Sequence, residues 1–307
     1  MIKFYIPDGH LEPKTLSLFQ KIGYDLVFGD RAYSPTSDDP ELELKRLRPQ
    51  DFPYLLAMDK GDLGIVGLDI LTEFQLEAPE QGRHLKELLD LGVHSDRLVV
   101  AVSEQIYPDV LSMADVQTHI AGPLAAKREM VVATEYPALA EQYLKKNGIN
   151  ATIRQPAGKT EAWIVPPHPE ADLIIETVET GRTLLANRCR VIDEVMTSSA
   201  RLVANVRSLE DPAKKDKISE ILELFRGALS AAGMVNVYMD VVCSDDLEPV
   251  LNVLSDYVQA PTISDLRGGG YDVFVVIHER DLKFLLPKLR RKGASSIVVS
   301  EVRMLFG

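Results

Sequence analysis

Cysteine is almost absent from this chain of 307 residues, which contains only Cys189 and Cys243. Two cysteines in separate segments build neither a disulfide framework nor a closely spaced zinc site. Long apolar runs are absent too, because no stretch approaches the roughly 18 residues of a membrane span. The start of the chain, "MIKFYIPDGH", holds too short an apolar stretch for a signal peptide. We therefore expect a cytoplasmic protein that does not interact with a membrane.

Positive charge is in deficit, since 34 Lys and Arg residues face 46 Asp and Glu residues and the formal net charge is −12. A general nucleic-acid binder needs a basic surface, so nucleic acid is not an expected partner. Small polyanions remain compatible with this charge where local donors and metal ions hold them. The chain length and the hydrophobic content of 46% predict a globular protein of two or three domains.

Strand and helix signals alternate over residues 1–185, which predicts parallel sheets with helical crossovers. We expect a first lobe of residues 1–93 together with 186–232, and a second lobe of residues 94–185. Residues 188–206 resemble two antiparallel strands, and a long amphipathic helix follows them. Because ligands of open α/β sheets lie beyond the carboxyl ends of the strands, the expected site is a cleft between the lobes.

Residues 233–307 show a different order of elements: strand, helix, strand, strand, helix, strand. This βαββαβ order is that of the ferredoxin-like unit, which is common in domains that bind small regulatory molecules. The segment "RGGG", residues 267–270, is expected to form its central hairpin turn. The predicted fold class is therefore α/β, with a two-lobed region like that of periplasmic binding proteins and a C-terminal ferredoxin-like domain.

The stretch "ETVETGRTLLAN", Glu176 to Asn187, follows an apolar run rich in β-branched residues and ends in a helical pattern. In such a strand-to-helix turn, backbone N–H groups and Thr hydroxyls converge on one anion, and Gly181 allows its close approach. Glu176 and Glu179 beside that anion suit sugar hydroxyls or a divalent cation. The pattern indicates a ribose 5-phosphate site, while an ordinary capped helix of an α/β domain remains the open alternative.

Several further segments occur in an order that resembles one family, the long form of ATP phosphoribosyltransferase, the first enzyme of histidine biosynthesis. They are "RPQDFP" (48–53), "DLGIVGLD" (62–69), "RLVVAV" (97–102), "VATEYP" (132–137), "AGKT" followed by Glu161, "ETGRTL" (179–184), "APTISDL" (260–266) and "KGASSIVV" (292–299). The likeness extends along nearly the whole chain. Short-form members of the family lack the βαββαβ tail.

This resemblance implies transfer of the phosphoribosyl group of phosphoribosyl pyrophosphate to N1 of ATP, with release of pyrophosphate. Catalysis would rest on positioning, electrostatics and Mg²⁺. The implied catalytic residues are Glu176, Glu179, Arg31 and Arg48, with Mg²⁺ at Glu176 and Glu179. The implied phosphoribosyl pyrophosphate site comprises Thr177, Glu179, Thr180, Gly181, Arg182, Thr183 and Leu184. The implied nucleotide site comprises Asp8, Gly9, His10, Leu11, Gly64, Gly67, Asp69 and Glu161.

The resemblance also implies a homo-oligomer, either a dimer or a hexamer, and inhibition by L-histidine bound to the C-terminal domain. Asp240 in "YMDV" is a carboxylate near the centre of an expected strand, where an unpaired charge is costly, so the ammonium group of an amino acid would pair with it. The implied effector residues are Asp240, Thr262, Ser264 and Ser295. The alternative is that this domain only assembles the oligomer.

The first strand departs from the family pattern. Where the family usually has a Lys-Gly-Arg-Leu turn, this chain has Asp8, Gly9, His10 and Leu11. Exchanging Lys for Asp beside a polyanion replaces attraction by repulsion, and each unit charge at contact is worth about 4 kcal/mol at an effective dielectric constant of 20. The chain also has Glu176 where the family usually has Asp. The alternatives are therefore a member that acts on another base, a non-catalytic binding protein, or a histidine-sensing partner of an active paralogue.

Overall fold

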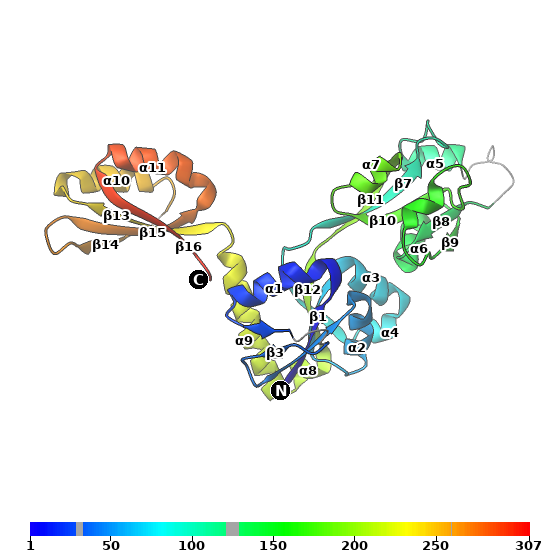
Figure 1. The fold of residues 1–307 in the computed structure, drawn as a ribbon, viewed down its shortest axis with the longest axis horizontal. Coiled ribbons are helices and arrows are strands. Elements are labelled where there is room, and N and C mark those ends of the chain that lie inside the picture. Colours follow the sequence, from blue (N-terminus) through cyan, green and yellow to red (C-terminus); the bar gives the residue numbers. More distant parts are fainter. Residues whose placement is uncertain (29–32, 121–128, 259) are drawn as a thin grey trace. The chain divides into compact units, whose positions relative to one another are not determined.

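The computed structural model of the chain describes residues 1–28, 33–120, 129–258 and 260–307. They form two compact units (Figure 1), one of residues 1–20 and 24–222 and one of residues 21–23 and 223–307. Within the described residues, no helix combines the length and the apolar character that crossing a membrane requires.

The first lobe of the larger unit contains a five-stranded sheet in the order β4-β1-β5-β12-β6. Its strands are β1 (Ile2–Pro7), β4 (Leu42–Leu47), β5 (Leu63–Gly67), β6 (Leu85–Asp90) and β12 (Ala200–Asn205). Its helices are α1 (Glu12–Lys21), α2 (Phe52–Ala57), α3 (Leu68–Glu77), α4 (Pro79–Gly82) and α8 (Val206–Glu210). Short elements are η1 (Gly9–Leu11), η2 (Pro49–Asp51), and the paired β2 (Leu26–Val27) and β3 (Thr36–Ser37). Strand β5 is buried along its whole length because helices pack against it, as its continuous apolar sequence predicts.

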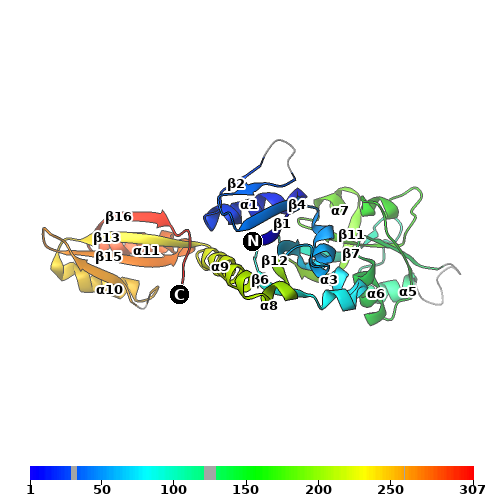
Figure 2. The same cartoon turned by 90° about the horizontal axis from the view of Figure 1, so that it is seen from below.

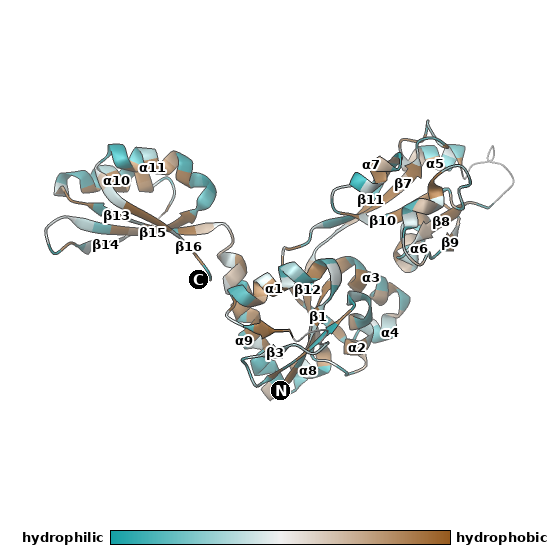
Figure 3. Cartoon of the chain, in the orientation of Figure 1, coloured by the Kyte–Doolittle hydropathy of each residue, from teal (hydrophilic) through white to brown (hydrophobic). Residues whose placement is uncertain are grey.

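The second lobe contains a sheet in the order β11-β7-β10-β8-β9. Its strands are β7 (Asp96–Ser103), β8 (Val131–Thr134), β9 (Thr152–Arg154), β10 (Leu173–Val178) and β11 (Cys189–Ser198). Its helices are α5 (Met113–His119), α6 (Pro137–Lys146), α7 (Arg182–Ala186) and the 3₁₀ helix η3 (Thr160–Ile164). Strands β7 and β10 are apolar along most of their length (Figure 3), and their buried side chains form the core of this lobe.

The sheets are mixed rather than parallel, which corrects the expectation from the alternating pattern. Strand β12 is antiparallel to β5 and to β6, and β7 is antiparallel to β10 and to β11. Strands β11 and β12 do not form a hairpin, because the chain leaves the second sheet at Ser198 and joins the first at Ala200. Residues 189–198, which the expected division places in the first lobe, thus extend the sheet of the second.

The C-terminal unit has the expected βαββαβ order. After α9 (Pro212–Ser230) come β13 (Met234–Val241), η4 (Ser244–Asp246), α10 (Leu247–Leu254), β14 (Thr262–Asp265), β15 (Tyr271–His278), η5 (Glu279–Asp281), α11 (Leu282–Arg291) and β16 (Ala294–Glu301). The antiparallel sheet has the order β14-β15-β13-β16. Figure 2 shows β13 between β15 and β16. This is the ferredoxin-like arrangement, and the expected fold class is confirmed.

Alternation along β13 explains how this domain folds. Val235, Val237, Met239 and Val241 are buried against α10 and α11, while the residues between them face the opposite side of the sheet. The "RGGG" turn joins β14 to β15 as expected. Gly270 has a φ of +86°, and a Cβ atom there would lie 2.5 Å from the carbonyl oxygen of Val241. The turn therefore requires glycine at this position.

Candidate functional site

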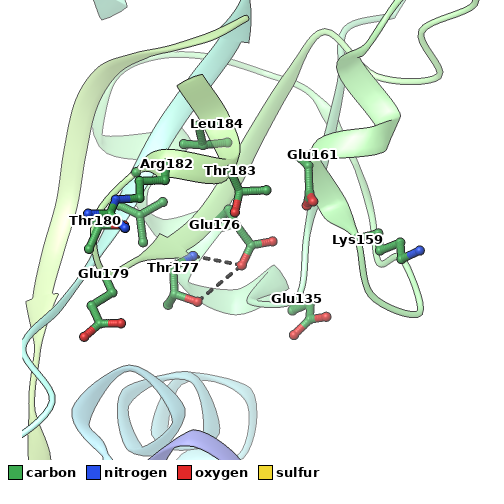
Figure 4. A pocket seen from close by; sticks show the side chains of 12 residues that line it. Glu135, Lys159, Glu161, Glu176, Thr177, Glu179, Thr180, Arg182, Thr183 and Leu184 are labelled. Carbon is green, nitrogen blue, oxygen red and sulfur yellow. Dashed lines mark hydrogen bonds between the residues drawn. The ribbon is translucent and has the colours of Figure 1, made fainter. Parts of the chain in front are cut away.

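A cavity of about 420 Å³ lies at the carboxyl end of β10 in the second lobe (Figure 4). It is lined by Glu135, Lys159, Glu161, Glu176, Thr177, Val178, Glu179, Thr180, Gly181, Arg182, Thr183 and Leu184. The cavity thus gathers all residues that the sequence assigns to the phosphoribosyl pyrophosphate site. The described lining residues all come from the second lobe, although the expected location is a cleft between the lobes.

The turn between β10 and α7 forms one wall of this cavity. Gly181 precedes α7 in the left-handed conformation, with a φ of +69°, and no side chain caps the helix. A Cβ atom on Gly181 would meet no atom within 4 Å, so the backbone here borders open space. The first N–H groups of any helix have no partner within that helix, which makes them available to an anion. Leu184 is buried and anchors the turn in the core of the lobe.

Glu176 brings a partly buried carboxylate to the cavity. The Thr177 N–H donates to its Oε1 over 2.9 Å, and the Thr177 hydroxyl donates to the same oxygen over 3.2 Å. Burial raises the pKa of Glu176, the charge of Glu135 raises it further, and the Thr177 donors oppose this rise. Burial is the dominant cause, because removal from water disfavours the charged form of the carboxyl group. A carboxylate in this setting is stabilised by new donors, such as sugar hydroxyls, or by a cation.

Glu179 and Glu176 do not converge on one point. Glu179 is exposed, and Figure 4 shows its carboxylate directed away from that of Glu176. In the part of the chain that the structure describes, no three His, Cys, Asp or Glu side chains are grouped so that they could hold a metal ion. Mg²⁺ usually binds through one or two carboxylates together with substrate phosphates and water. Glu176 fits that mode, whereas a cage made only of protein ligands does not form among the described residues.

Two lining residues lie outside the sites that the sequence implies. Glu135 directly follows β8, and Lys159 directly follows Gly158 in "AGKT". Both positions come after the carboxyl end of a strand, a signal that places Glu135 at the expected cleft and that could also have identified Lys159. Glu161, expected on the nucleotide side, lines this same cavity. Figure 4 shows the carboxylates of Glu135, Glu161 and Glu176 around one space.

The turn of Asp8 to Leu11, which departs from the family pattern, directly follows β1. Asp8 precedes η1, Gly9 has a φ of +73°, and His10 is exposed with its Nε2 4.0 Å from Asp96 Oδ2. The Leu11 side chain is buried in the core and holds the turn in place, and its part in nucleotide binding stays a prediction.

The two arginines expected to bind polyphosphate are both in the first lobe. Arg48 is exposed and precedes η2. Arg31 lies outside the described residues. Neither belongs to the described lining of the Glu176 cavity.

Asp69, Gly64 and Gly67 are buried. Ser198 and Tyr136 donate hydrogen bonds to the two carboxylate oxygens of Asp69, over 2.7 and 2.6 Å. A Cβ atom on Gly67 would lie 2.3 Å from Asp69 Oδ1, so this glycine makes room for that carboxylate. A Cβ atom on Gly64 would face Phe52 and other core side chains. These positions have packing and hydrogen-bonding roles in the described residues, and their part in nucleotide binding stays a prediction.

The residues expected to bind an effector share the uncovered face of the C-terminal sheet. Asp240 pairs with Ser295 on one side and with Asp272 on the other, and Asp272 pairs with Ser264. These four residues therefore form one row across the sheet. The Ser295 hydroxyl donates to the Asp240 carbonyl over 3.2 Å. Two neighbouring carboxylates repel each other, and a cation beside them would relieve that repulsion.

Thr262 lies outside this row. It is also exposed, but it pairs with Phe274.

Comparison with known proteins gives consistent matches over both units. A family model described as "ATP phosphoribosyltransferase" matches residues 48–227, and one described as "HisG, C-terminal domain" matches residues 231–304. A protein of Archaeoglobus fulgidus named ATP phosphoribosyltransferase is 38% identical over 257 residues, which cover 83% of this chain and 89% of that protein. One of the same name from Pelotomaculum thermopropionicum is 33% identical over 303 residues, which cover 97% and 96%.

A similar fold is found among solved structures. The "ATP phosphoribosyl transferase (HisG:HisZ) complex from Thermotoga maritima" contains a chain that matches with a TM-score of 0.58 and 23% identity. The match covers 75% of this chain and 99% of that chain. At this identity the likeness concerns the fold.

Proposed function

This chain belongs to the ATP phosphoribosyltransferase family, and on that premise we propose that the turn before α7 binds the 5-phosphate of phosphoribosyl pyrophosphate. The family reaction transfers the phosphoribosyl group to ATP and is the first step of histidine biosynthesis. The observation that carries the proposal is the open left-handed turn at Gly181, which shares one cavity with Thr180, Thr183 and Glu176. Backbone N–H groups and two hydroxyls suit a phosphate, and the adjacent carboxylate suits ribose hydroxyls.

The reaction needs positioning more than covalent chemistry. N1 of adenine attacks the anomeric carbon of the ribose while pyrophosphate leaves from the opposite face, so the configuration at that carbon is inverted. Held by the turn and by Glu176, the ribose presents this carbon in a fixed orientation, which supplies proximity and alignment. Arg182 and Lys159 are the cations among the lining residues, and we assign them to the negative charge of the substrate.

Mg²⁺ is the cofactor we propose, in keeping with a phosphoribosyltransferase. When bound, it would neutralise charge on the pyrophosphate leaving group. Glu176 is the carboxylate placed to contact it, and the phosphates would supply most other ligands. Glu179 is the second candidate, although it extends from the other side of Thr177 (Figure 4).

The nucleotide side of the site is assigned to the first lobe. We propose that Arg48, Arg31 and the turn of Asp8, Gly9 and His10 lie near the phosphates of ATP. Arg48 and His10 are exposed and free of core packing, which supports this role. Asp8 opposes it electrostatically, and a member that uses another base remains the second candidate function on that observation.

The C-terminal domain is assigned to regulation. We propose that L-histidine binds the row of Ser264, Asp272, Asp240 and Ser295, with its ammonium group at the two carboxylates. The uncovered face of the sheet also suits assembly of a homo-oligomer, a dimer or a hexamer. A cytoplasmic location completes the proposal, because ATP and phosphoribosyl pyrophosphate are the substrates.

The direct test measures pyrophosphate release from phosphoribosyl pyrophosphate in the presence of Mg²⁺, first with ATP and then with other nucleotides and free bases. Release that depends on ATP is expected. If pyrophosphate release is faster with another base, that base, and not ATP, is the acceptor. Absence of release with every acceptor, in a folded protein, would refute the catalytic assignment.

A further inference from the structure

Helix α3 of the first lobe carries two carboxylates that reach the second lobe. Asp69 and Glu73 are four residues apart, so they lie on the same face of the helix, and both are buried. Helix α3 begins at the carboxyl end of β5, and it contacts α6, which begins just after the carboxyl end of β8 (Figure 2). The contact therefore joins the two lobes on the side of their sheets where ligands bind.

Glu73 caps the start of α6 from the other lobe. Its Oε1 accepts the Ala138 N–H over 2.7 Å, and its Oε2 accepts the Leu139 N–H over 2.8 Å. N–H groups in the first turn of a helix have no partner within that helix, and they form the positive end of its dipole. Glu73 thus occupies the anion-binding end of α6, whereas no described side chain caps α7 beside the phosphoribosyl cavity.

Further contacts of α3 accompany this cap. The Tyr136 hydroxyl donates to Asp69 Oδ2 over 2.6 Å, and the Ser198 hydroxyl donates to Asp69 Oδ1 over 2.7 Å. Ile70 and Leu76 pack against the apolar core of the second lobe. One helix of the first lobe is therefore joined to the second lobe by polar and apolar contacts, in addition to the two crossings of the chain.

We propose that Glu73 is a positioning residue for the transfer step, because it holds the start of α6 against α3 and so fixes the two lobes in the arrangement that brings ATP to the phosphoribosyl group. This inference rests on the proposed function. Binding of phosphoribosyl pyrophosphate does not need this arrangement, because the described residues that line its cavity all belong to the second lobe. Attack by ATP does need it, because a small displacement of the reacting atoms removes the productive alignment.

The variant Glu73→Gln tests this role by comparing two ligands. Glutamine has nearly the same shape, but one end of its amide is a donor, so it cannot accept both N–H groups. The kcat/KM for ATP, measured by pyrophosphate release, should fall about tenfold because a hydrogen bond to a charged group is lost. The Kd of phosphoribosyl pyrophosphate, measured by calorimetry with Mg²⁺, should stay within about twofold. A merely structural role in the second lobe would change both values.

Hydrogen exchange observes the contact itself. The amides of Ala138 and Leu139 lie in the first turn of α6, and Glu73 is their acceptor. In the wild type both amides should be protected from exchange. Glu73→Gln should accelerate their exchange by about tenfold or more, while amides in later turns of α6 keep their protection.

Glu77 supplies a matched control, because it lies one turn further along α3 and is exposed. Glu77→Gln makes the same chemical change in the same helix, and it should leave the kcat/KM for ATP, the Kd and the amide exchange within about twofold of the wild type. Glu73→Asp keeps the charge but is one methylene shorter. It takes the place of Glu73→Gln if that protein does not melt as a folded one, and its kcat/KM for ATP should fall about threefold or more.

Failure of this inference is distinguishable from failure of the proposed function. If the wild type neither binds phosphoribosyl pyrophosphate nor releases pyrophosphate from it, the proposed function is wrong and this inference falls with it. If the wild type is active and the folded Glu73 variant keeps its kcat/KM for ATP, or binds phosphoribosyl pyrophosphate more weakly by the same factor, Glu73 does not position the lobes. Unchanged exchange at Ala138 and Leu139 in that variant would also overturn the inference.

Discussion

Two glycines with nearly the same backbone conformation allow the phosphate turn to be tested without confusing strain with loss of binding. Gly181 has a φ of +69° and lines the cavity, whereas Gly148 has a φ of +68° and follows α6. A Cβ atom would meet nothing within 4 Å at Gly181, and at Gly148 the nearest atom is Gln117 Nε2 at 3.9 Å. Alanine therefore fits at both sites, and each substitution carries the cost of the left-handed region alone.

The expected loss of stability is the same for both variants. A residue with a Cβ atom in the left-handed conformation costs about 1–2 kcal/mol. For a folding unit of this size, 1 kcal/mol lowers the melting temperature by roughly 2–4 °C. Gly181→Ala and Gly148→Ala should therefore each melt about 2–8 °C below the wild type. Melting curves recorded without ligand measure this shared effect.

The affinity for phosphoribosyl pyrophosphate should distinguish Gly181→Ala from Gly148→Ala. At Gly181 the methyl group occupies the space in which phosphate oxygens would meet the backbone N–H groups. Loss of one hydrogen bond to a charged group costs about 1.5–3 kcal/mol, which is roughly a 10- to 150-fold rise in Kd. Gly181→Val should bind still more weakly because its side chain is branched. Gly148→Ala should bind phosphoribosyl pyrophosphate as the wild type does.

Calorimetric titration of phosphoribosyl pyrophosphate into each variant, with Mg²⁺ present, gives the comparison. The turn does not bind the phosphate if Gly181→Ala shows the same Kd as Gly148→Ala while both melt at the same lowered temperature. Equal weakening in both variants would show that general strain, and not the turn, controls the affinity.

Three other predictions concern charge. Burial raises the pKa of Glu176, so its ionisation destabilises the folded state as the pH rises through that raised pKa. Glu176→Gln should therefore melt above the wild type at pH 8, lose that advantage below about pH 4 and lose transferase activity; a lower melting temperature at pH 8 would contradict this. The double change Asp8→Lys and His10→Arg should lower the KM for an anionic substrate at low salt more than at high salt, and slower turnover with every nucleotide would refute the ATP assignment. Asp240→Ala should abolish the shift in melting temperature caused by millimolar L-histidine while sparing catalysis, whereas absence of any shift in the folded wild type would leave the domain a structural role.

Local patterns in the sequence determined much of the architecture. A buried run such as β5 needs only apolar residues in succession, and alternating residues in β13 predict a sheet with one covered face. The turn at Gly181 was also predictable, because its strand, glycine and helix are adjacent in the chain. Interactions of this kind depend on residues a few positions apart, so the sequence displays them directly.

Contacts between distant segments were decided only by the tertiary structure. Asp69, a predicted nucleotide residue, accepts hydrogen bonds from Ser198 and Tyr136, which lie 129 and 67 positions away in the chain. Strand β11 joins β7 rather than β12, since pairing depends on which edge of a sheet is open when the chain returns to it. The sequence shows that a carboxylate is present, but the stability of its charged form in the folded protein depends on the hydrogen-bond donors that surround it. Those donors arrive from other elements, and no local pattern predicts them.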